Sequence, residues 1–168
     1  EATMAAIMRG MEVGLPPMQA LSSIAVINGR ASLWGDVIPA LMHRAGHDIE
    51  VDLEGEGDEQ KAVAVLTRGD NGKVVVREFS VEDAKTAGLW NKPGPWKTYP
   101  KRMLMHRARS WAVRDGASDA MMGMQIAEEM QDVPAPRDVT PRMSGFAARA
   151  EKARKAEELQ KAQEDQPL

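Results

Sequence analysis

The densest group of side chains that could bind an anion lies between Lys97 and Arg114. This segment contains six Lys or Arg residues and no acidic residue. Cationic side chains bind nucleic acid by neutralising phosphates, which requires a high charge over about 8–10 Å rather than a basic whole protein. The segment therefore predicts a surface for a polyanion, although the chain has a net charge of −3 and a pI near 5.7.

A long helix over about residues 99–114 would carry most of these side chains. Pro100 suits the first helical position, and Gly116 lies beyond the expected end. Successive residues are about 100° apart around a helix, so the apolar and the basic side chains fall on different sides. The apolar side contains Leu104, Met105, Ala108, Trp111 and Ala112, and the wide opposite arc contains Arg102, His106, Arg107, Arg109 and Arg114.

This basic arc has no acidic residue in its own helix with which to pair. Like charges on one face repel one another, so we expect the arc to be exposed and to receive an anion. Two alternatives stay open: a solvated face on an ordinary helix, and a surface covered by acidic groups of a partner protein or of residues 48–59. Trp96 and Trp111 could also belong to the core, and the helical position of Trp111 favours the core for that residue. An exposed ring in this region would stack on a base for about 1–3 kcal/mol.

Acidic side chains are concentrated over residues 48–59, which include seven of them and no basic residue. Asp48, Glu50, Asp52 and Glu54 alternate along one face of an expected strand and could hold Mg²⁺, but we expect a solvated strand face that discourages aggregation. His43 and His47 have the spacing of a metal pair without a third ligand, so we expect both to be solvated near a helix end. The chain has no cysteine and no Ser-His-Asp pattern. We predict no catalytic residue, metal or cofactor.

Helix and strand patterns alternate through the rest of the chain. Helices are expected over residues 2–11, 17–21, 36–45, 80–88 and 119–131, and strands over 24–27, 30–34, 49–53, 62–67 and 73–79. Asn28-Gly29 favours a tight turn, Asp36 could cap the helix that follows it, and Ser80 with Asp83 resembles a capping box. The expected fold is α+β: a small antiparallel sheet with packed helices and the long basic helix near residues 99–114.

Three parts are expected along the 168 residues. Residues 1–133 form a core, residues 134–143 a Pro-rich linker, and residues 144–168 a charged, helical C-terminal extension. Hydrophobic residues make up 43% and charged residues 28%, as in globular proteins. The chain has no apolar run long enough to cross a bilayer and no secretory signal, so we expect a cytoplasmic protein that does not contact a membrane.

Short motifs follow one another along the chain. They are Gly14-Leu15-Pro16-Pro17, Ile27-Asn28-Gly29-Arg30, Ala84-Lys85-Thr86-Ala87-Gly88-Leu89, Gly94-Pro95-Trp96, Tyr99-Pro100-Lys101-Arg102-Met103-Leu104 and His106-Arg107-Ala108. A run from Asp119 to Glu129 follows, with Gly123 and the pair Glu128-Glu129. In this order and spacing the motifs resemble the RecT/Red-beta family of phage single-strand DNA annealing proteins, over about residues 1–133.

The resemblance implies ATP-independent annealing of complementary strands in phage homologous recombination and repair, without a hydrolytic active site. A homo-oligomer, as a ring or helical filament, would grip single-stranded DNA and the annealed duplex intermediate by the backbone in a basic groove. A phage exonuclease is the implied partner, and the cytoplasm of a bacterial host cell is the implied location. Lys101, Arg102, Arg107 and Arg114 match the family's DNA-contacting positions.

The DNA-binding candidates combine these positions with the rest of the basic arc and its neighbours. They are Arg30, Lys97, Lys101, Arg102, His106, Arg107, Arg109 and Arg114. Two other functions stay open. One is a structural assembly protein whose basic helix is a subunit interface, and the less favoured one is a metal-dependent nucleic-acid enzyme.

Overall fold

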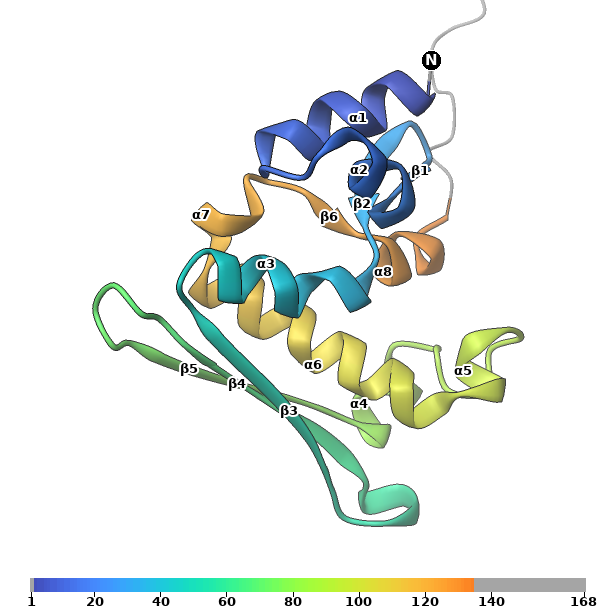
Figure 1. Ribbon diagram of the computed structural model, residues 1–168. Helices are drawn as coiled ribbons and strands as arrows, with labels where there is room; N and C mark the ends of the chain where they lie inside the picture. The colour runs from blue at the N-terminus through green and yellow to red at the C-terminus, as the bar shows by residue number, and fades with distance from the viewer. Residues whose placement is uncertain (1, 135–168) are drawn as a thin grey trace, which may run out of the picture. The chain divides into compact units, whose positions relative to one another are not determined.

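The computed structural model describes residues 2–134, whose elements are arranged as Figure 1 shows. Two helices, α1 (Ala2–Glu12) and α2 (Pro17–Ser23), pack on each other and on a hairpin of β1 (Ile24–Ile27) and β2 (Arg30–Leu33). Asn28 and Gly29 join the two strands with positive φ angles of 52° and 74°. These angles are those of the predicted two-residue turn, so the hairpin prediction is confirmed.

A second sheet is antiparallel throughout, in the order β3-β4-β5. Its strands are β3 (Asp48–Glu54), β4 (Lys61–Thr67) and β5 (Val74–Ser80). Alternate residues of β4 are buried, including Ala62, Ala64 and Leu66, because this face of the sheet receives a helix. The predicted strands therefore exist, and their predicted ends are within one residue of the observed ones.

Short helical segments precede, join and follow the strands of the second sheet. A 3-10 turn, η1 (Gly35–Val37), leads into α3 (Ile38–Arg44), a second one, η2 (Gly57–Glu59), joins β3 to β4, and α4 (Val81–Thr86) follows β5. Ser80 and Asp83 form the predicted capping box at the start of α4. The predicted cap by Asp36 is wrong. The helix α3 has no side-chain cap, because Asp36 lies within η1 and accepts hydrogen bonds from Arg102 instead.

The long helix α6 (Pro100–Gly116) crosses the middle of the described part, after the short helix α5 (Pro95–Thr98) (Figure 1). One side of α6 packs on the sheet of β3, β4 and β5, and another side contacts α8 (Ala127–Asp132). Gly116 is the last helical residue rather than the residue beyond the end. A Cβ atom there would lie 2.7 Å from Leu66 Cδ2, so glycine permits the close contact of helix and sheet.

The predicted helix over residues 119–131 is wrong. The chain instead forms α7 (Ser118–Met121), a short strand β6 (Gln125–Ile126) and α8. Met122 and Gly123 have φ angles of 47° and 73°, which end α7. The strand β6 pairs in parallel with β2, so the hairpin becomes part of a mixed sheet in the order β1-β2-β6. The α+β class is confirmed, with two small sheets in place of one.

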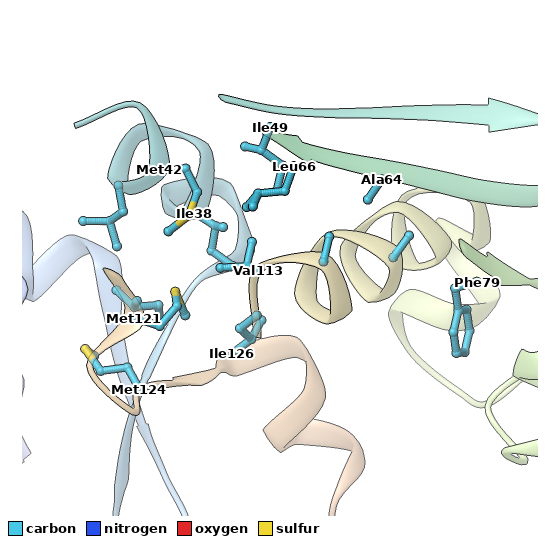
Figure 2. Packing of buried hydrophobic residues seen from close by; sticks show 14 of the residues in the cluster. Ile38, Met42, Ile49, Ala64, Leu66, Phe79, Val113, Met121, Met124 and Ile126 are labelled. Atoms are coloured by element: carbon cyan, nitrogen blue, oxygen red, sulfur yellow. The ribbon is translucent and has the colours of Figure 1, made fainter. Parts of the chain in front are cut away.

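One hydrophobic core joins the elements. Figure 2 shows Ile38 and Met42 near Ile49 and Leu66 of the second sheet, with Val113 between these residues and the side chains of Met121, Met124 and Ile126. Several of these side chains are fully buried, among them Ile38, Met42, Leu66, Val113 and Ile126. Burial of Met121, Met124 and Ile126 together is the reason why this segment is not one helix, since a single helix would not turn all three to the core.

Beyond Pro134, the predicted linker and the extension over residues 144–168 lie outside the described residues. Within residues 2–134, no helix is both long and apolar enough to cross a membrane.

Candidate nucleic-acid interface

The basic side chains of α6 do not share one exposed face. Because the helix packs on the second sheet and also contacts α8, most of its circumference is covered. His106 is buried, and Arg107 and Arg109 are partly buried. Lys101, Arg102 and Arg114 are exposed. The prediction that the basic side chains are exposed is therefore wrong for the middle of the helix and correct at its two ends.

Arg107 and Arg114 are held by carboxylates of α8. The Nη2 atom of Arg107 donates to Oδ2 of Asp132 at 2.7 Å, and its Nη1 atom lies 3.6 Å from Oε1 of Glu129. Arg114 donates to the other oxygen of Glu129, and Ser110 Oγ donates to Oε1 at 2.6 Å. The side chain of Arg107 is only 15% exposed, so this guanidinium already has its anion within the fold.

Asp132 ties three segments together. Besides Arg107, its carboxylate accepts hydrogen bonds from Lys92 Nζ at 2.7 Å and from Trp96 Nε1 at 2.8 Å. Burial alone would raise the pKa of Asp132, but the hydrogen bonds from Lys92, Trp96 and Arg107 outweigh burial and lower the pKa. Trp96 is buried, and its indole nitrogen is paired to this carboxylate.

The core position predicted for Trp111 is wrong. Its side chain is 37% exposed and packs one edge against Phe79, with ring centroids 5.1 Å apart. A groove of about 380 Å³ opens beside it, lined among others by Leu89, Arg114 and Met130. Trp111 is therefore at the margin between the sheet and α8, where neither covers the helix.

His106 is packed inside the fold. Burial lowers its pKa, and the neighbouring Arg109 and Arg102 lower it further, whereas Glu128 and Asp36 act in the opposite direction. The imidazole is therefore neutral near pH 7. Its Nδ1 atom has no hydrogen-bond partner within the described residues. A Cβ atom at position 35 would lie 2.4 Å from this nitrogen, so Gly35 leaves the space that the ring occupies.

Arg109 is partly buried beside this histidine. Its Nη1 atom donates to the carbonyl oxygen of Gly35 at 3.4 Å, and no ion pair with another residue of the described part is present. Burial lowers the pKa of Arg109, but an arginine stays protonated at neutral pH. The Gly35 amide donates to both carboxylate oxygens of Glu128, at 3.1 and 3.0 Å, so the backbone here is fixed between α6 and α8.

Exposed cations gather where α5 meets α6. Lys97, Lys101 and Arg102 are exposed there around Tyr99, and we refer to these four residues as the cationic corner. Within residues 2–134, neither lysine forms an ion pair. Arg102 donates to Asp36 at 2.8 and 2.6 Å, with both side chains mostly in solvent. Arg30 is exposed at the turn of the β1–β2 hairpin. The elements β1 and β2 lie apart from α5 (Figure 1).

The acidic side chains of β3 face away from α6, although the strand itself packs on this helix. In β3, Ile49 is buried against the core, and Glu50 and Asp52 lie on the opposite, exposed face. These carboxylates therefore do not neutralise the basic helix. In the part of the chain that the structure describes, no group of three or more His, Asp or Glu residues is arranged to hold a metal ion.

The expectation of solvated histidines is correct for one residue of the pair. His43 is exposed and lies 3.6 Å from Asp48. His47 is buried, and its Nδ1 atom accepts a hydrogen bond from the Gly69 amide at 3.3 Å. The loop that follows α3 folds back onto the β4–β5 turn, which removes His47 from water.

Sequence reasoning missed the acidic residues that neutralise the basic helix. They are Asp36, Glu129 and Asp132, whereas Glu128 binds the Gly35 amide. A usable signal was present: three carboxylates fall within residues 128–132, beside the apolar Ile126, Ala127 and Met130, as expected of a helix that packs on a basic one. The exposure of Tyr99 had no signal, because its spacing is compatible with either burial or solvent.

The structure thus defines an α+β protein with a central helix. Carboxylates of the fold pair with Arg102, Arg107 and Arg114 of this helix, and exposed cations gather at one of its ends. The chain belongs to the RecT family, whose model matches residues 22–141, so that α1 and most of α2 precede the match. This membership implies annealing of single-stranded DNA in recombination, and RecT proteins are annealing proteins rather than hydrolases. No curated protein matches the chain.

Proposed function

We propose that this chain anneals complementary DNA strands without ATP and grips each strand by its phosphates at the cationic corner. The supporting observation is that some of the basic side chains form ion pairs within the fold and others do not. Lys97 and Lys101 have no ion pair within the described residues, whereas Arg107 and Arg114 are bound to carboxylates of α8. A cation without a protein partner is the one that a phosphate can neutralise with release of counterions.

The other candidates then act in two ways. Arg102, Arg114 and Arg30 are exposed and extend the contact along the strand. For this, Arg102 exchanges Asp36, and Arg114 exchanges Glu129, for a phosphate. His106, Arg107 and Arg109 are positioning residues, since they hold α6 against α8 and the Gly35 turn.

Annealing requires no sequence-specific contact between the protein and the bases. Phosphate contacts supply affinity without a choice of sequence, and they leave the bases free to meet a second strand. Watson–Crick pairing then supplies specificity and the driving force, so no nucleotide hydrolysis is required. We further propose that the ligands are single-stranded DNA and the annealed intermediate, in the cytoplasm of a bacterial host, and that a phage exonuclease supplies the strand.

An oligomer is part of this proposal, and two exposed apolar surfaces support it. The methionine face consists of Met4, Met8, Met11, Met18 and Leu21 on α1 and α2. The valine face lies on the side of the second sheet away from α6 and includes the exposed Val74 and Val76. Contiguous exposed apolar surface marks contact sites, and two different contact sites on one chain allow head-to-tail assembly into a ring or filament.

The test is duplex formation between two labelled complementary oligonucleotides, without ATP or divalent metal, over a salt series. The variant carrying Lys97→Glu and Lys101→Glu is compared with one carrying Lys73→Glu and Lys85→Glu, which makes the same change of charge at exposed sites elsewhere. We expect the wild type and the second variant to accelerate annealing. The corner variant should bind weakly, with a salt slope smaller by about 1.4, because each lost contact to a single strand removes about 0.7.

Absence of binding to either strand by the wild type, even at low salt, would contradict the proposal. The second candidate function, a structural assembly protein, would then be favoured by the two apolar surfaces. In that case the corner variant would change the size of the assembly instead of DNA binding.

A further inference from the structure

We propose that Tyr99 is a stacking platform for an unpaired nucleobase, with Lys97 and Lys101 on the flanking phosphates. This inference rests on the proposed function and identifies the part of the DNA strand that binds at the cationic corner. The ligand is a nucleotide step of single-stranded DNA, bound through a base face and its backbone.

The exposure of Tyr99 is the first observation. Its side chain is 67% exposed, the largest exposed fraction of any aromatic residue within residues 2–134. Burying such a ring would contribute about 1.5–3 kcal/mol to stability, and the fold leaves this contribution unused. A ring left in water between cations is available to a ligand with a flat apolar face.

The backbone that carries the ring is held from both sides. The Tyr99 amide donates to the Pro95 carbonyl oxygen at 2.8 Å, and the Tyr99 carbonyl oxygen accepts from the Met103 amide at 3.1 Å. Pro95 and Pro100 each occupy the start of a helix, where the fixed φ angle of proline is favourable. Little backbone freedom is lost when a ligand covers a ring held in this way, which favours binding.

The surroundings of the ring fit a nucleotide. A hollow of about 370 Å³ is lined by Thr98, Tyr99, Pro100, Lys101 and Arg102, a size within the range of about 300–1,000 Å³ typical of small-ligand sites. The rings of Tyr99 and Pro100 give the hollow apolar surface, and Lys101 and Arg102 add cations to its lining. A polyphosphate would use only the cations, and a membrane would require a wider apolar face, whereas a nucleotide uses both the ring and the cations.

Stacking on Tyr99 is compatible with annealing. A stacked base presents its face to the ring and keeps its Watson–Crick edge in solvent, where a second strand can pair with it. Every base has such a face, so the contact tolerates any sequence.

The experiment compares the wild type with Tyr99→Ala and Tyr99→Phe on two strands of equal length, one normal and one without bases. We expect Tyr99→Ala to weaken binding of the normal strand about tenfold or more, as for other aromatic stacking contacts, and Tyr99→Phe to bind as the wild type does. All three proteins should bind the abasic strand equally. A 2-aminopurine in the normal strand should be quenched by the wild type and Tyr99→Phe, and not by Tyr99→Ala.

The failures of the two proposals are distinguishable. A wild type that binds neither strand overturns the proposed function. A wild type that binds, while Tyr99→Ala binds the normal strand equally well, overturns stacking and leaves the function standing. An equal loss for normal and abasic strands in Tyr99→Ala, with an unchanged thermal melting curve, would also overturn stacking, because the ring would then act on the phosphate contacts alone.

Discussion

Each cation of α6 has an environment that its neighbours along the chain do not reveal. Lys101 and Arg107 are less than two helical turns apart, yet the lysine is in solvent and the arginine is bound to Asp132 and Glu129. Removing one partner of a largely buried ion pair leaves a charge without compensation, whereas removing a solvated cation has little effect on stability. Reversal of Arg107 is therefore a poor test of DNA binding, since it also disturbs the fold.

Asp132→Asn tests this assignment. The side chain is 9% exposed and accepts from Lys92, Trp96 and Arg107, so we expect the free energy of unfolding to fall by about 3 kcal/mol. Denaturant unfolding followed by circular dichroism measures the change. Glu82→Gln, at an exposed position of α4, should change stability by less than about 0.5 kcal/mol. Equal effects of the two substitutions would refute the structural role of Asp132.

The same carboxylate makes stability depend on pH. The folded-state pKa of Asp132 is lowered, so its contribution is fully present above the unfolded-state value of about 4 and is lost as pH falls through the lower folded value. The stability difference between the wild type and Asp132→Asn should therefore shrink below about pH 4. Unfolding curves at pH 7 and pH 3 measure it, and a difference that grows toward low pH would contradict the assignment.

At the scale of elements, the segment after α6 shows how a local pattern is overridden. Residues 119–131 have helical spacing, but their apolar side chains must fill a core that also contains α3 and the second sheet. These side chains reach the core because the chain makes a left-handed turn at Met122 and then forms a short strand beside β2. Only glycine adopts such a turn without strain, and Met122 is not glycine.

Met122→Gly should stabilise the protein. The methionine side chain is exposed, so its removal loses little packing, and relief of the left-handed conformation should raise the free energy of unfolding by about 0.5–1 kcal/mol. Met122→Ala keeps the strain and should give no increase. Thermal melting of the two variants beside the wild type measures both effects, and a loss of stability in Met122→Gly would show that the side chain makes contacts that matter.

At the scale of the whole molecule, the methionine face and the valine face lie on different elements, as head-to-tail contact requires. Met8→Glu with Met18→Glu places two charges on the methionine face, and burial of unpaired charges opposes association. We expect smaller assemblies by sedimentation velocity. Met122→Glu alters an exposed methionine outside both faces and should leave the size unchanged. Unchanged assemblies in the double variant would exclude the methionine face as a contact.

Local sequence was sufficient to predict five strands, the Asn28-Gly29 turn, the capping box at Ser80 and the family, because each depends on neighbours within a few residues or on motifs in order. The short strand β6 and the carboxylate partners of the cations depend on the tertiary fold. The partners of Arg107 and Arg102 are 25 and 66 residues away, and periodicity within one helix cannot indicate which carboxylates are brought to it. The tertiary fold also decided that α6 is covered on more than one side, since packing against both the second sheet and α8 follows from the assembly of all elements.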